Sequence, residues 1–168
     1  IPPHRLEELV HHYEAVGGKS PPNEITFRQA KALQNVLNES GHALPVYVGM
    51  RNSQPFFSDT LKKMFDDGIR TSLGFILSSH RTEASWERYQ DNVAEACAEI
   101  GERAPAVDYC TSWHNHPRLI QCWTENIQAS FAKLALGQRQ STPLIFTAHS
   151  LLVAMAARSP YVQQLEET

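Results

Sequence analysis

Four short apolar runs, separated by segments of helical length, constrain the fold of this chain more than any other feature. They begin near residues 46, 72, 106 and 143. Between successive runs lies one segment whose apolar residues recur at helical spacing. Strands and helices that alternate in this way form βαβ units, whose right-handed connections build a parallel sheet with helices on both faces. The sequence therefore predicts an α/β fold with a doubly wound parallel sheet.

The expected boundaries follow from periodicity and from helix-ending residues. Gly17-Gly18 is expected to end the first helix, and Asn23 is expected to be the N-cap of the second. We expect strands over residues 46–50, 72–77, 106–110 and 143–147, and helices over residues 5–16, 23–39, 55–65, 83–100 and 115–134.

Composition excludes several classes of protein. The 168 residues carry a formal net charge of −3, which provides no basic field for nucleic acid. No run approaches eighteen apolar residues, so no membrane span is expected. The three cysteines are odd in number and contain no CxxC pair, which argues against disulfides and an iron–sulfur cluster and favours a reducing cytoplasm. The glycine-rich nucleotide-binding motifs are also absent from the sequence.

Histidines follow three of the four predicted strands. His80 comes after the second strand, His114 and His116 after the third, and His149 after the fourth. Because ligands of open α/β sheets bind beyond the carboxyl ends of the strands, these imidazoles are expected at one rim. Each has a structural alternative, since a histidine after a strand commonly caps the next helix or bonds a loop carbonyl.

Five sequence blocks occur in the order found in one known enzyme family. The block around His149, Phe-Thr-Ala-His-Ser-Leu, is similar to the signature [FS]-[ST]-A-H-S-[LI]-P. The other blocks are similar to Y-x-x-I-G-G-x-S-P, Y-x-G-M-R, L-x-P-H and DPY-x-x-Q, and they occupy residues 13–21, 47–51, 77–80 and 159–164. In these blocks the chain resembles the ferrochelatase family.

The resemblance implies an enzyme that inserts ferrous iron, its substrate, into a porphyrin during heme biosynthesis. It implies two Rossmann-like domains with the porphyrin between them. His149 then corresponds to the active-site histidine, as a metal ligand or as acceptor of a pyrrole proton, and His80 to a second metal-binding histidine. Four further residues match positions that contact the porphyrin or its propionates. These are Tyr13, Ser20, His12 and His114.

The chain departs from the family pattern at several positions. Leu152 and Ser79 stand where the family has proline, and Ser159 stands where it has aspartate. His12 replaces a frequent arginine, which would weaken a propionate contact if its ring is neutral, and His114 replaces a frequent tyrosine. These changes are expected to shift loop geometry while the imidazoles stay in place.

The resemblance also predicts how the domains are divided. Residues 1–150 would form the N-terminal domain without its first strand, and residues 151–168 would lead into a second domain that contains an acidic partner of His149. A sheet without its first strand leaves backbone edges or apolar surface exposed. We therefore expect the chain alone to lack full activity.

Two other functions remain open on the sequence. One is an inactive fragment or a module that binds a tetrapyrrole without inserting metal, and the other is a cobalt or nickel chelatase for a different tetrapyrrole. The sequence does not define which porphyrin, protoporphyrin IX or coproporphyrin III, would be used, nor the oligomeric state. It is compatible with peripheral membrane association.

Overall fold

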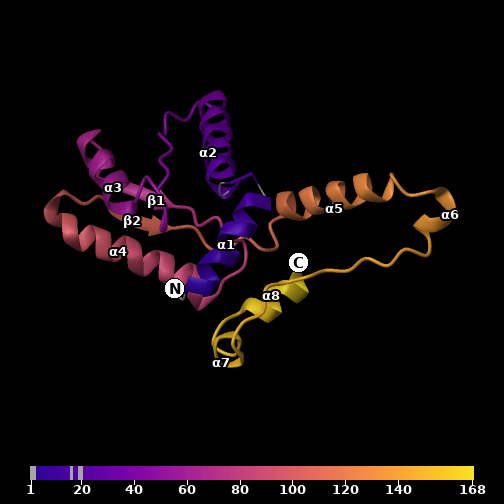
Figure 1. Cartoon of the computed structure of the whole chain (residues 1–168). Helices are drawn as coiled ribbons and strands as arrows, with labels where there is room; N and C mark the ends of the chain where they lie inside the picture. The colour runs from indigo at the N-terminus through magenta and orange to yellow at the C-terminus, as the bar shows by residue number, and fades with distance from the viewer. Residues whose placement is uncertain (1–2, 16, 19–20) are drawn as a thin grey trace. The chain divides into compact units, whose positions relative to one another are not determined.

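The computed structural model describes residues 3–15, 17–18 and 21–168. The chain divides into two compact units, Ile1–Gly68 and Ile69–Thr168. Figure 1 labels their helices and strands.

The described residues of the first unit form three helices. Helix α1 spans Pro3–Ala15, α2 spans Pro21–Glu39 and α3 spans Phe57–Asp66. The predicted stop after α1 is confirmed, because Gly18 has a positive φ of 76° and its N–H reaches the carbonyl of Tyr13 at 2.7 Å. That conformation favours glycine, which has no Cβ to clash. Helix α3 buries Leu61 and Met64, whose spacing of three places them on one helical face.

The second unit is built on one β–helix–β connection. Strands β1 (Thr71–Gly74) and β2 (Ala106–Tyr109) pair in parallel, with Thr71 opposite Ala106 and Gly74 opposite Tyr109. They lie side by side in Figure 1. A π-helical turn η1 (Glu83–Glu87), α4 (Arg88–Ile100) and a 3₁₀ turn η2 (Gly101–Arg103) join them. This is the crossover that the sequence predicts between its second and third strands.

Four helices follow β2. They are α5 (Pro117–Phe131), α6 (Leu136–Arg139), α7 (Val153–Ala156) and α8 (Tyr161–Glu167). Helix α5 begins as expected for a proline in the first turn, and Nδ1 of His116 accepts a hydrogen bond from the N–H of Arg118 at 3.2 Å. His116 is therefore a helix cap, which is the structural alternative open for it on sequence grounds.

The predicted four-stranded sheet needs correction. Among the described residues the sheet has two strands, β1 and β2. Residues 46–50 make only an isolated bridge between Met50 and Phe56, and residues 143–147 form no ladder. An apolar, β-prone run becomes a strand only when a neighbouring strand supplies its hydrogen bonds, and neither run has such a neighbour here. The structure thus has a mixed helix and strand fold with a small parallel sheet.

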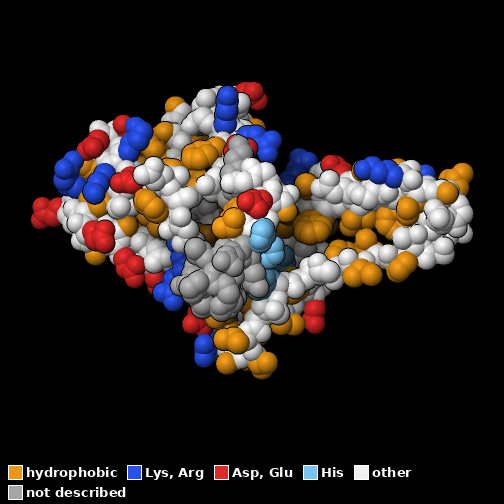
Figure 2. All heavy atoms as spheres, in the orientation of Figure 1, with side chains coloured by type: hydrophobic (Ala, Val, Ile, Leu, Met, Phe, Trp, Pro, Cys, Tyr) orange, Lys and Arg blue, Asp and Glu red, His pale blue; other side chains and the backbone are white. Residues whose placement is uncertain are grey.

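Few hydrophobic side chains are buried among the described residues. They are Leu61 and Met64 in the first unit and Ile76, Trp86 and Ala96 in the second, where Pro105 is also fully buried. Many large apolar side chains are instead exposed, and Figure 2 shows hydrophobic side chains gathered along α5 and the extended segment after α6. Seven such residues lie between the start of α5 and the start of α7: Trp123, Leu136, Leu144, Ile145, Phe146, Leu152 and Val153.

Candidate active site

The loops that follow β1 and β2 hold two of the predicted histidines. Trp86, on η1, donates from Nε1 to the carbonyl of Ser78 at 2.9 Å, two residues before His80. Trp113, just before His114, donates from Nε1 to the carbonyl of Ile76 at 3.0 Å. Each indole therefore fixes the backbone of the loop after β1, and the second one ties the two loops together.

His80 and His114 lie beside one another, with ring centroids 6.1 Å apart. Thr168 Oγ1 donates its one proton to the Gln164 carbonyl at 2.7 Å, so it accepts from Nε2 of His80 at 3.0 Å. The other nitrogen, Nδ1, then accepts from Ser79 Oγ at 2.9 Å. Burial, together with repulsion from His114, lowers the pKa of His80, which favours the neutral ring that a metal needs as ligand.

His114 is the more buried of the two, with 8% of its surface exposed. Its Nε2 lies 2.8 Å from Glu167 Oε2, and the hydrogen bond with His114, followed by that from Gln163, lowers the pKa of Glu167. A carboxylate only accepts, so Nε2 carries the proton. Nδ1 of His114 is buried and has no hydrogen-bond partner among the described residues.

His149 lies on the extended segment after α6, and its side chain is exposed. Its Nδ1 donates to the carbonyl of Ser150 at 2.7 Å, which leaves Nε2 as the acceptor nitrogen of a neutral ring. The hydroxyl of Tyr161 donates to the His149 carbonyl at 3.3 Å, and the Tyr161 ring meets His80 edge-on with centroids 6.1 Å apart. One tyrosine thus connects the two histidines that the sequence predicts as metal ligands.

The residues matched to porphyrin contacts are described less completely. Tyr13 and His12 lie on α1 in the first unit, and both side chains are exposed. Ser20 lies outside the described residues.

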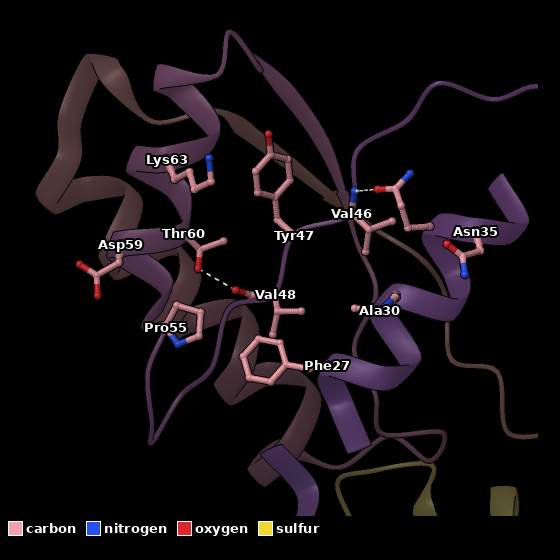
Figure 3. A pocket seen from close by; sticks show the side chains of 12 residues that line it. Phe27, Ala30, Asn35, Val46, Tyr47, Val48, Pro55, Asp59, Thr60 and Lys63 are labelled. Carbon is pink, nitrogen blue, oxygen red and sulfur yellow. Dashed lines mark hydrogen bonds between the residues drawn. The ribbon is translucent and has the colours of Figure 1, made fainter. Parts of the chain in front are cut away.

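A cavity among the described residues of the first unit is lined by none of these candidates. It has a volume of about 660 Å³ and lies between α2, residues 46–48 and the start of α3 (Figure 3). Gln34 Oε1 accepts from the N–H of Val46 at 2.7 Å, and Thr60 Oγ1 donates to the carbonyl of Val48 at 2.8 Å. Side chains here take hydrogen bonds that a neighbouring strand would otherwise make.

The described residues contain no cluster of three or more His, Cys, Asp or Glu side chains arranged to hold a metal ion. None of the described helices combines the length and apolar character that a membrane span requires.

Comparison with known proteins identifies the family. The family model described as Ferrochelatase matches residues 1–168. The chain belongs to the ferrochelatase family. The resemblance seen in the five sequence blocks is thereby confirmed.

Several curated ferrochelatases are similar to the chain along nearly all of its length. A ferrochelatase of Rhodopirellula baltica is 35% identical over 168 residues, which are 100% of this chain and 48% of that protein. A coproporphyrin III ferrochelatase of Geobacillus kaustophilus is 34% identical over 170 residues, which are 99% of this chain and 53% of that protein. Another of that name, from Mycobacteroides abscessus, is 35% identical over 158 residues, 94% of this chain and 45% of that protein. The chain spans about half the length of these relatives.

Sequence reasoning missed the part that α8 plays in this candidate site. Side chains of Tyr161 and Glu167 on α8, and of Thr168 directly after it, contact the predicted histidines. The only sequence signal was the Pro-Tyr-x-x-Gln block, which marks the helix without indicating what it contacts.

Proposed function

We propose that this chain supplies the His149-bearing part of an enzyme that inserts ferrous iron into a porphyrin. The observation that carries the proposal is the family match over residues 1–168, which includes the block around His149. The link through Tyr161 between His149 and His80 supports it further.

The chemistry of metallation suits the groups present. When Fe²⁺ enters the macrocycle, four Fe–N bonds form and two pyrrole N–H bonds release their protons. An imidazole, whose ordinary pKa is about 6.5, can accept such a proton near neutral pH. In His149 the accepting nitrogen is Nε2, because Nδ1 is occupied by the carbonyl of Ser150. The same lone pair is alternatively a ligand for the incoming ion.

His80 is proposed as the histidine that holds ferrous iron before transfer. Its lowered pKa favours the neutral imidazole, in which Nδ1 carries a lone pair and no proton. Ser79 Oγ occupies that lone pair at 2.9 Å, and the ion would displace this hydroxyl. A proline at this position, as in the family pattern, has no hydroxyl to displace.

Tyr13, Ser20, His12 and His114 are proposed as contacts to the porphyrin. Tyr13 and His12 have exposed side chains on α1, which suits contact with a ligand. His114, with 8% of its surface exposed, offers less area. Relatives named coproporphyrin III ferrochelatase make coproporphyrin III the first porphyrin to test, with protoporphyrin IX as the comparison.

We also propose that residues 46–50 and 143–147 become strands beside β1 and β2 in the whole protein, as the doubly wound sheet requires. Exposure of Ile145 and Phe146, at 79% and 70%, supports this, because such a strand would bury them. Residues 1–150 would then form the N-terminal domain and residues 151–168 the start of a second. A cytoplasmic location, expected from the cysteines, stays a prediction.

Metal insertion measured with and without His149 tests the function. The longer protein that contains this chain is mixed anaerobically with Fe²⁺ and coproporphyrin III, and metalloporphyrin formation is followed by absorbance. We expect His149→Ala to lower turnover by about 10²-fold or more, the range for losing a general acid–base group. His42→Ala, which removes an exposed histidine from the first unit, is the matched control. Unchanged turnover in His149→Ala would refute the assignment.

A tetrapyrrole-binding module is the second candidate. The departures from the family pattern at Leu152, Ser79 and Ser159 favour it. Porphyrin binding by the 168-residue chain at micromolar concentration, without metal insertion by the longer protein, would support this module. A cobalt or nickel chelatase would be identified by acceptance of a different tetrapyrrole, since chelatases accept several metals.

A further inference from the structure

Helix α8 contacts both histidine-bearing loops through one buried side chain. Gln164 is 6% exposed, and both ends of its amide are engaged. Its Oε1 accepts from the N–H of Arg81 at 2.7 Å, and its Nε2 donates to Ser112 Oγ at 3.0 Å. Arg81 follows His80 directly, and Ser112 precedes His114 by two residues.

A glutamine amide suits this position because it is a donor and an acceptor at once. A buried polar group without a partner costs free energy, so both loops are held where the amide can reach them. The two partners are 83 and 52 residues away along the chain. Gln164 therefore fixes the distance between the His80 loop and the His114 loop through contacts that a local turn could not make.

The same anchor places the other polar groups at the end of α8. Glu167 and Thr168 lie one turn beyond Gln164, so they project from the same side of the helix. Glu167 bonds the His114 ring at 2.8 Å. Thr168 Oγ1 accepts from Nε2 of His80 at 3.0 Å and lies 3.3 Å from the carbonyl of His114. Loss of the Gln164 contacts would release both rings together.

We propose that Gln164 is a positioning residue, which holds the imidazoles of His80 and His114 in a fixed mutual arrangement and so presents His80 to the metal. The metal part of this proposal rests on the proposed function. The positioning part does not, because it concerns ring geometry alone. A purely structural role would make the chain less stable without altering the rings in the folded protein.

The test compares two replacements at one site with a matched control. Gln164→Met keeps the length of the side chain and removes both hydrogen bonds. Gln164→Glu keeps both, because a carboxylate accepts from the N–H of Arg81 and from the rotated hydroxyl of Ser112. Gln128→Met makes the same chemical change at an exposed position of α5.

Histidine ring ¹H–¹⁵N spectra of the folded 168-residue chain are the first measurement. We expect Gln164→Met to shift the ring resonances of His80 and His114 and to leave the exposed His42 unchanged. Gln164→Glu and Gln128→Met should retain the wild-type spectrum. If Gln164→Met does not fold, Ser112→Ala removes one of the two bonds and should shift the His114 ring.

The second measurement adds Co²⁺ alone and follows the paramagnetic broadening of the His80 ring. We expect Gln164→Met to raise the Co²⁺ concentration for half-broadening about tenfold, the lower range for losing a group that orients a ligand histidine. Unchanged ring spectra in Gln164→Met, or in Ser112→Ala if that variant is needed, would overturn the positioning role. Shifted rings with unchanged Co²⁺ broadening would overturn only the metal part. Failure of His149→Ala to affect metal insertion would refute the proposed function and leave the ring result standing.

Discussion

Replacing each tryptophan with phenylalanine tests how the loop before His80 is held. The three indoles occupy different environments. Trp86 is 4% exposed and bonds the carbonyl of Ser78, whereas Trp113 is half-buried and bonds the carbonyl of Ile76. Trp123 lies on α5 with 49% of its surface exposed. The same substitution at three sites therefore separates burial from hydrogen bonding.

The expected cost is largest for Trp86→Phe. The lost indole N–H leaves the Ser78 carbonyl without its partner, which costs about 1–3 kcal/mol. The smaller ring leaves roughly 40 Å³ of cavity, which at about 24 cal/mol per Å³ adds about 1 kcal/mol. We expect a total of about 2–4 kcal/mol. Trp113→Phe keeps the stacking on Phe75, whose ring centroid is 5.3 Å away, and should cost about 1 kcal/mol for its hydrogen bond.

Urea unfolding followed by far-UV circular dichroism gives the free energy of unfolding for each variant, with an unchanged m value as the check that the unfolded states are comparable. Trp123→Phe should stay within about 0.5 kcal/mol of the wild type. A loss in Trp86→Phe no larger than that in Trp123→Phe would refute the reasoning. So would a loss in Trp113→Phe that exceeds the loss in Trp86→Phe.

Three further outcomes follow from the structure. Because folding lowers the pKa of His80, the unfolded chain binds a proton at this residue more readily than the folded chain does. The free energy of unfolding, measured by urea titration, should therefore fall as the pH drops below about 6.5, and His80→Gln should weaken this pH dependence. Ser79→Ala frees Nδ1 of His80 and should lower the Co²⁺ concentration needed to broaden that ring; a higher concentration would contradict the assigned tautomer. A Cβ at Gly74 would lie 2.8 Å from the ring of Tyr109, so Gly74→Ala should lower the free energy of unfolding by about 1–3 kcal/mol. In the control Gly137→Ala the added Cβ meets nothing within 4 Å, so thermal unfolding should be unchanged.

Local patterns predicted the elements that depend on nearby residues. The five expected helices appear within a few residues of their expected bounds, because helical spacing is written in consecutive residues. The expected N-cap Asn23 was wrong, since α2 begins at Pro21 and contains it. Residues 72–77 and 106–110 were predicted to be strands, and β1 and β2 lie at these places but are shorter. Residues 46–50 and 143–147 have the same apolar character and form no strand here, because pairing depends on a neighbour that composition does not specify.

The histidine cluster was predicted only in part. Strand ends indicated that His80 and His114 would lie near each other, and the structure places their rings 6.1 Å apart. The contacts of Gln164 and Thr168 could not be read from the sequence, since their partners lie 52 to 88 residues away. These contacts form only when the folded chain brings the distant residues together.

The span of these contacts has a consequence for synthesis on the ribosome. Thr168 is 88 residues downstream of His80, and synthesis adds about 5–20 residues per second. The loop after β1 therefore emerges on the order of ten seconds before the residues that fix its imidazole. During that interval His80 cannot make its contact with Thr168, so the nascent chain acquires its ordered pair of histidines only after α8 has been made.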